Sequence, residues 1–163
     1  MHRLFSPWRL KYVTAASGEG SGACIFCEAL ERNDPLVIHR GAHTFVILNL
    51  YPYNNGHLMV VPNRHIGRLA DARPEELSEL MALTRAAEMA LTEAYAPHGL
   101  NMGLNLGKPA GAGVLDHVHM HVVPRWNGDT NFMSVVGKTR VLPEELPATA
   151  DRLRPIFARL SNS

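Results

Sequence analysis

The chain has 163 residues, of which 46% are hydrophobic and 19% charged, and its formal net charge at pH 7 is +1. This length supports one buried core, so we expect a single domain. The small net charge argues against binding of a nucleic acid polymer through counterion release, although a small anionic ligand remains compatible. No apolar run approaches a membrane span and the N-terminus lacks an apolar signal core, so we expect a cytoplasmic protein without a membrane partner.

The two cysteines of the chain, Cys24 and Cys27, form a C-x-x-C motif after a glycine-rich stretch at 17–23. This spacing occurs in zinc sites and in redox motifs. A thioredoxin-like site would follow a strand and begin a helix at its second cysteine, whereas 17–23 is typical of a flexible loop. We therefore favour zinc over an inert reduced pair or a redox site, and two further ligands must then come from elsewhere.

The middle of the chain predicts an antiparallel sheet. Strands are expected at 37–40, 44–48 and 57–62, with turns at Gly41 and at 51–56 between them.

A long helix follows, beginning at Pro74 and ending before Pro97, because apolar residues recur at helical spacing between these prolines. We expect this helix to cover one face of the sheet. A fourth strand is expected at 101–106.

The last part of the chain contains a glycine-rich loop at 107–113, a fifth strand at 116–124 and a helix-prone stretch at 144–160. Pro147 and Pro155 would each end or kink an ordinary helix in that stretch. Glycines let backbone N–H groups turn toward an anion, although such a loop is by itself more often a plain turn.

Three histidines alternate with apolar residues in the fifth strand: His117, His119 and His121. In an extended strand their imidazoles share one face. Histidine can act as nucleophile, proton carrier, metal ligand or anion clamp near neutral pH. A metal bound by all three is an alternative that needs a carboxylate, and only Asp116 is near in sequence.

This histidine run resembles the signature of the histidine triad nucleotide-binding proteins. Further residues extend the resemblance from Cys24 to about Trp126: Asn49, Gly56-His57, Pro62, His65 and Asn105-Leu-Gly107. It implies an α+β, HIT-like fold with a five-stranded antiparallel sheet, one long helix and a C-terminal helical segment, usually as a homodimer. Residues 1–163 would then form one domain with an N-terminal extension at 1–23 and a C-terminal tail from about 127 to 163.

The resemblance also implies catalytic roles. His119 would attack the α-phosphate of a nucleotide derivative and form a nucleotidyl-histidine, without a catalytic cofactor. His121 and His57 would bind the non-bridging phosphate oxygens, with a purely structural role as the alternative for His57.

In cysteine-bearing members of the family, a structural zinc is held by residues that correspond here to Cys24, Cys27, His65 and His117. Four protein ligands leave no open position on the metal, so it would brace the site rather than catalyse.

For the substrate, the resemblance implies that Asn49 binds the ribose hydroxyls and that Asn105 approaches the phosphate or the leaving group. An Asn that ends a strand is otherwise a common turn residue. Apolar residues near Asn49, Ile47 and Leu48, could form a wall for the base, and Trp126 could offer it a stacking surface.

The loop before the triad departs from the pattern of many family hydrolases, which carry Ala-Gly-Gln there. Gly111, Ala112 and Gly113 stand in these places, so the glutamine amide is absent and backbone N–H groups would bind phosphate. Together with Ser6–Arg9 and 124–132, this loop resembles the bacterial branch of diadenosine tetraphosphate phosphorylases.

That branch uses inorganic phosphate to cleave diadenosine tetraphosphate into ADP and ATP, and we expect this nucleotidyltransferase reaction. Arg125, Lys108 and Lys138 would add positive charge for the polyphosphate, or would be solvated surface residues. The alternatives are a hydrolase of dinucleoside polyphosphates or adenosine phosphoramidates, and a non-enzymatic nucleotide-binding module that holds AMP.

Overall fold

The computed structural model describes residues 23–129 and 144–160. In chain order, the elements are α2 (Ile25–Glu31), β1 (Val37–Arg40), β2 (Thr44–Leu48), β3 (Leu58–Pro62), η1 (Leu69–Asp71), α3 (Pro74–Tyr95), β4 (Gly99–Leu104), η2 (Lys108–Ala110), β5 (Met120–Arg125) and α5 (Leu146–Leu160). None of the helices in these ranges is long and apolar enough to cross a membrane.

The five strands form one sheet in the order β1-β2-β3-β5-β4, and every neighbouring pair is antiparallel. The expected α+β architecture with a five-stranded antiparallel sheet is therefore confirmed. The central strands β2 and β3 are buried along their whole length, because both faces of the sheet are covered.

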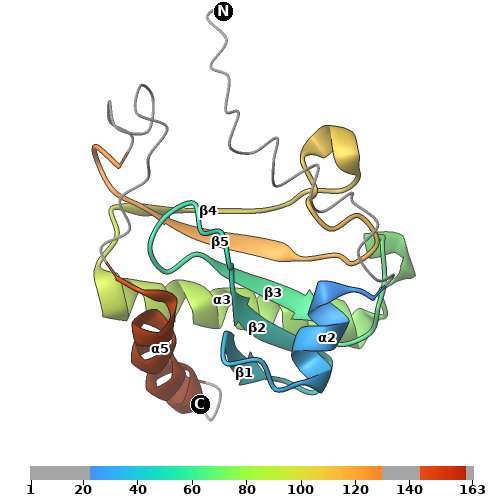
Figure 1. Cartoon of the computed structure of the whole chain (residues 1–163), viewed down its shortest axis with the longest axis horizontal. Coiled ribbons are helices and arrows are strands. Elements are labelled where there is room, and N and C mark those ends of the chain that lie inside the picture. The colour runs from blue at the N-terminus through green and yellow to red at the C-terminus, as the bar shows by residue number, and fades with distance from the viewer. Residues whose placement is uncertain (1–22, 130–143, 161–163) are drawn as a thin grey trace, which may run out of the picture.

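The two faces of the sheet pack against different helices (Figure 1). On one face, Val46 of β2 and Val60 of β3 join the larger core with α3 and α5. On the other face, Phe45 and Met59 form a smaller core with Phe26 of α2. This division follows from the period of two along a strand, which sends successive side chains to opposite faces. The face toward α2 carries the site described below.

The expected helix between Pro74 and Pro97 is α3, which covers one sheet face as expected. Its Glu79 carboxylate accepts hydrogen bonds from the backbone amides of Ala42, His43 and Thr44 at 2.9, 2.6 and 2.5 Å. A single side chain therefore fixes the hairpin between β1 and β2 to the helix.

Strand boundaries differ from the sequence-based expectation at the two strands that flank the glycine-rich loop. β5 begins at Met120 rather than 116, because the amide of Val118 donates instead to the carbonyl of Ile66 at 2.7 Å. β4 covers Gly99–Leu104 rather than 101–106, because the chain then turns into the short helix η2.

The C-terminal helical stretch is continuous through Pro155 and contributes to the main core. Leu153 and Phe157 of α5 are fully buried there, so this part of the expected tail belongs to the packed domain. Pro155 and Asp151, whose carbonyl loses its helical partner, are both exposed, and water can hydrogen-bond the freed carbonyl. The N-terminal extension lies outside the described residues up to Ala23.

Candidate active site and metal centre

The strand register brings the chemically active side chains together on the face toward α2. His121 of β5 lies between Met59 of β3 and Gly103 of β4 in the antiparallel ladder. His119 immediately precedes β5, and its ring lies 4.9 Å from that of His121, nearly perpendicular to it. His57 immediately precedes β3, and its ring lies 5.1 Å from that of His121. Residues far apart in sequence thus form one histidine cluster.

His119 is buried and held in one tautomer. Its Nδ1 lies 2.8 Å from the backbone carbonyl of His117. A carbonyl oxygen only accepts hydrogen bonds, so Nδ1 carries the proton and Nε2 keeps a free lone pair. Burial lowers the pKa of His119, and the bond to the carbonyl offsets this only in part. A neutral imidazole with an available Nε2 is the form that a nucleophile requires.

His57 and His121 form a hydrogen bond, and a backbone amide determines which of the two rings is the donor. The amide of Tyr53 donates to Nδ1 of His57 at 3.1 Å, so the proton of His57 is on Nε2. That Nε2–H lies 3.0 Å from Nδ1 of His121 and donates to it. In its neutral form His121 therefore carries its proton on Nε2, from which it can donate a hydrogen bond to a substrate.

His57 is fully buried, with both ring nitrogens hydrogen-bonded within the protein. This geometry does not support the expected direct contact of His57 with phosphate oxygens. It favours a positioning role through His121.

Asn49 serves the turn that precedes His57. Its Oδ1 accepts from the amide of Tyr51 at 3.0 Å, and its Nδ2 lies 3.3 Å from Nδ1 of His57. Asn49 is 8% exposed. These contacts favour the turn alternative for Asn49, with its amide helping to orient His57, over the expected contact with ribose.

The four residues expected to bind zinc come together at the start of α2. Their ligand atoms all lie within 4.8 Å of one another: Cys24, Cys27, His65 and His117. Nδ1 of His117 is 3.3 Å from Sγ of Cys24 and 3.7 Å from Sγ of Cys27, and Nδ1 of His65 is 3.5 Å from Sγ of Cys27. Ligands of a tetrahedral zinc are separated by about 3.4 to 3.8 Å, and these three N–S distances are close to that range.

The chemistry of the donors also fits a cation. Nε2 of His117 donates to the carbonyl of Pro62 at 2.9 Å, which leaves the lone pair of Nδ1 facing the cysteines. Burial and the neighbouring Cys24 raise the pKa of Cys27 to about 11, because two thiolates repel each other in a poorly solvated site. A bound divalent cation would reverse this repulsion and favour both thiolates.

Helix α2 and Tyr53 contact the histidines of the site, and the sequence pattern did not predict this. Phe26, between the two cysteines, packs against the rings of His117 and His119 at 5.4 and 5.1 Å. It therefore links the candidate metal site to the buried nucleophile candidate. The aromatic residue inside the C-x-x-C was the available signal, but the short helix offered no long apolar period to detect.

Two backbone amides of the glycine-rich loop are used in hydrogen bonds within the loop itself. The amides of Gly111 and Ala112 close its turn by donating to the carbonyls of Lys108 and Gly107. Of the three amides at 111–113, that of Gly113 makes no backbone hydrogen bond within residues 23–129 and 144–160, so it is a candidate donor to an anion. Asn105 directly follows β4, one position beyond the pair of Leu104 with Met120, which brings it beside His119.

The segment after the triad is held by internal contacts. The guanidinium of Arg125 binds both carboxylate oxygens of Asp129 at 2.6 and 2.9 Å and the side-chain oxygen of Asn101 at 2.9 Å. The guanidinium of Arg125 is thus hydrogen-bonded within the protein, and this geometry does not support the expected bidentate contact with phosphate. Trp126 is half-buried and its amide donates to Asp129 at 3.2 Å. Ser6–Arg9, 130–132 and Lys138 lie outside the described residues.

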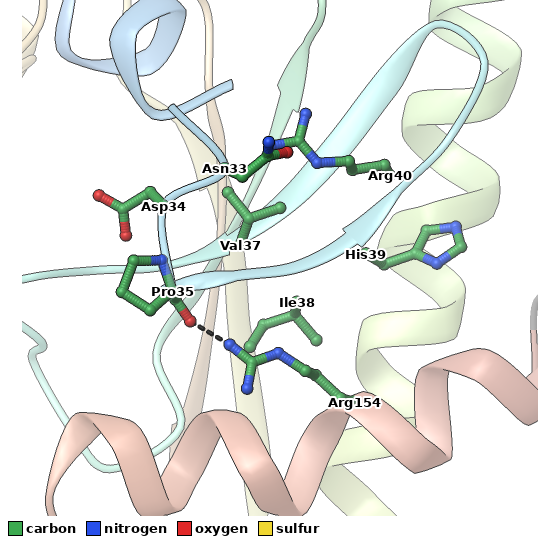
Figure 2. A pocket seen from close by; sticks show the side chains of 8 residues that line it. All are labelled: Asn33, Asp34, Pro35, Val37, Ile38, His39, Arg40 and Arg154. Atoms are coloured by element: carbon green, nitrogen blue, oxygen red, sulfur yellow. Dashed lines mark hydrogen bonds between the residues drawn. The ribbon is translucent and has the colours of Figure 1, made fainter. Parts of the chain in front are cut away.

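A cavity of about 420 Å³ lies away from the histidine cluster, at the edge strand β1 and helix α5 (Figure 2). Its lining mixes both charge signs, with Asp34 opposite Arg40 and Arg154, and Arg154 donates to the carbonyl of Pro35. None of the triad or cysteine residues lines this cavity.

Comparisons with known proteins identify the family. A family model described as "HIT domain" matches residues 31–128. The chain is 42% identical over 167 residues to "AP-4-A phosphorylase" of Mycobacterium tuberculosis, a match that covers 98% of this chain and 86% of that protein. It is 33% identical to an uncharacterized 16.1 kDa HIT-like protein of Mycoplasma pneumoniae, over 71% of this chain and 81% of that protein.

Solved structures agree as well. A Zn-bound histidine triad family protein from Mycobacterium smegmatis superimposes with a TM-score of 0.70 at 29% identity, covering 88% of this chain and 99% of that one. A histidine triad nucleotide-binding protein from Sulfolobus tokodaii also gives 0.70, at 26% identity, over 85% and 94% of the two chains. Family model, relatives and fold lead to one conclusion: the chain belongs to the histidine triad (HIT) family.

Proposed function

We propose that the protein is a nucleotidyltransferase that cleaves diadenosine tetraphosphate with inorganic phosphate, releasing ATP and then ADP. The observation that carries the proposal is the pair of fixed tautomers: Nε2 of His119 has a free lone pair, and Nε2 of His121 carries a proton. The relative in Mycobacterium tuberculosis named for AP-4-A phosphorolysis supports the choice of substrate.

In the first step, Nε2 of His119 attacks the α-phosphorus. A P–N bond forms, the P–O bond to the remaining triphosphate breaks, and ATP leaves while AMP stays bound to His119. The Nε2–H of His121 donates a hydrogen bond to the bridging oxygen, which leaves as an ionised phosphate oxygen of ATP and needs no proton, and the bond from His57 orients the His121 ring for this contact. The bond from Nδ1 of His119 to the carbonyl of His117 stabilises the positive charge that develops on the attacking ring.

In the second step, an oxygen of inorganic phosphate attacks the same phosphorus. The P–N bond breaks, ADP leaves and His119 is restored. No glutamine side chain occupies the loop at Gly111, Ala112 and Gly113, which leaves space for phosphate, and the amide of Gly113 is available to bind it. Asn105, which directly follows β4, would be a neutral donor to the phosphate or the leaving group.

We also propose that Cys24, Cys27, His65 and His117 hold a structural zinc. The spacing of their ligand atoms, the tautomer of His117 and the Zn-bound relative from Mycobacterium smegmatis support this. Zinc would neutralise the thiolates and fix α2 against the segment that carries His119. All four positions would be filled by protein, so the catalytic steps run through the histidines alone.

The proposal is tested by chromatography of the products from diadenosine tetraphosphate, incubated with and without inorganic phosphate. ADP and ATP formed only with phosphate support phosphorolysis, whereas AMP and ATP formed without phosphate identify a hydrolase. His119→Asn should lose turnover but keep AMP binding. Turnover of His119→Asn equal to that of the wild type would contradict the nucleotidyl-histidine, and no wild-type turnover would favour a binding role.

A further inference from the structure

Strand β4 presents a face without bulky side chains beside the candidate nucleophile. From Gly99 to Asn105 its sequence alternates, so that the face shared with His121 carries Gly99, Asn101, Gly103 and then Asn105. In the ladder Gly103 lies directly opposite His121. Side chains at opposite positions of an antiparallel pair start about 5 Å apart. A side chain at 103 would therefore stand next to the ring of His121.

The space at Gly103 is open. A Cβ built there meets no heavy atom within 4 Å among the described parts of the chain. The other sides of the cluster are closed, because Phe26 packs on the ring of His119 and the buried Met59 lies on the other side of His121. Within the described residues, the approach to His121 over Gly103 is therefore not obstructed at that position.

We propose that Gly103 determines specificity by leaving room for the part of the substrate beyond the reacting phosphorus. This inference rests on the proposed nucleotidyl transfer. The attacking nitrogen and the leaving oxygen lie roughly in line at phosphorus, so a polyphosphate leaving half must extend away from His119. The open face of β4 is where a triphosphate with its nucleoside can extend, whereas a small leaving group such as ammonia does not need this space.

The test replaces Gly103 with valine and uses Gly99→Val as the matched control. Both glycines lie on the same face of the same strand, neither has a positive φ, and neither Cβ would meet a neighbour within 4 Å. Valine is favourable in a strand, so both variants should fold. For each variant kcat/KM is measured with diadenosine tetraphosphate plus phosphate, and with adenosine 5′-phosphoramidate, whose leaving group is ammonia.

We expect Gly103→Val to lower kcat/KM for the dinucleotide by about tenfold or more, with little change for the phosphoramidate. Gly99→Val should leave both values near wild type, and Gly103→Ala should give a smaller loss. Equal losses on both substrates, or an unchanged value for the dinucleotide, would overturn the inference.

A failure of nucleotidyl transfer itself is distinguishable, because the wild type would then turn over neither substrate, with or without phosphate. In that case calorimetric binding of AMP and of diadenosine tetraphosphate to the same variants decides the point. Weaker binding of the dinucleotide alone by Gly103→Val supports the inference, and unchanged binding of both ligands rejects it. Light scattering on both valine variants provides the check that their assembly matches the wild type.

Discussion

At the residue scale, the chemistry depends on which ring nitrogen of each histidine carries a proton. Backbone groups fix this choice: the carbonyl of His117 for His119, and the amide of Tyr53 for His57. A backbone partner cannot be removed by a side-chain substitution, so the tautomers are a property of the fold. The alternation of the three histidines predicts proximity, but it does not reveal these partners.

His57 gives a kinetic prediction. His57→Asn removes the donor to Nδ1 of His121, so the proton that His121 would present to the substrate is no longer held on Nε2. We expect kcat to fall by about 100-fold with a small change in KM, because the substrate still binds the other groups. Steady-state kinetics check this, with His98→Asn as the control on an exposed histidine. An effect confined to KM would instead indicate direct contact of His57 with substrate.

Glu76 gives a prediction of stability against pH. Both of its oxygens bind the guanidinium of Arg64, at 2.9 and 2.8 Å, and this pairing lowers the pKa of Glu76 to about 2. Since the folded pKa lies below the unfolded value, the stabilisation is fully present above about pH 4.5 and is lost as pH falls toward 2.

We expect Glu76→Gln to lower the free energy of unfolding at pH 7, because it removes the charge that pairs with Arg64. The Arg64 side chain is 40% exposed and solvent screens the pair, so the expected loss is limited to about 2 kcal/mol. Urea unfolding between pH 7 and pH 3 measures the difference, which should shrink as the pH falls. Glu75→Gln, at an exposed neighbour, is the control. A difference that stays constant with pH would contradict the assignment to ionised Glu76.

At the element scale, the short helix α2 depends on what holds its first turn. Cys24 is its N-terminal cap residue and makes no side-chain capping hydrogen bond, and only Phe26 and Ala29 of the helix are buried. A helix of this length is marginal by itself. Its cysteines, by contrast, can be tied through one metal to His65 and His117, which belong to distant parts of the chain.

Chelation should therefore act on stability. Prolonged treatment with a strong chelator is expected to lower the melting temperature and to release one zinc per chain, counted by native mass spectrometry. The Cys24→Ser, Cys27→Ser double variant should bind no zinc, and chelator should not change its melting temperature. Immediate loss of turnover at constant stability, restored by added metal, would instead support a catalytic metal on the triad.

At the scale of the whole molecule, the exposed apolar side chains predict an interface. Leu77, Met81 and Met89 lie at helical spacing on α3 and are 38%, 57% and 40% exposed, and Met102 of β4 is 43% exposed. The expectation of a homodimer built around the long helix and a neighbouring strand remains a prediction, and these residues are its candidates.

Light scattering should give a mass of about twice 18.0 kDa for the wild type. Met81→Lys, which places a charge in the apolar stripe, should shift the mass toward one chain, whereas Glu75→Lys, at an exposed position about 120° around the helix from Met81, should not. A monomeric wild type would remove the dimer from the proposed assembly.

The sequence by itself determined the sheet, the long helix and the composition of both sites. Period-two patterns predicted the strands, helical spacing and flanking prolines predicted α3, and the histidine and cysteine motifs named the residues that come together. These signals are local, because they depend on how neighbouring residues share a face of one element.

Only the tertiary structure decided what the side chains do. Val118 donates to Ile66, His57 is enclosed with both nitrogens bonded, and Arg125 is bound by Asp129; each partner lies on another segment or in a turn whose course the pattern does not predict. The same holds for the open space at Gly103, which depends on the neighbouring strands and not on the glycine alone. Contacts between distant segments depend on packing in three dimensions, so the hydrogen-bond partners of these side chains could not be predicted from the sequence pattern.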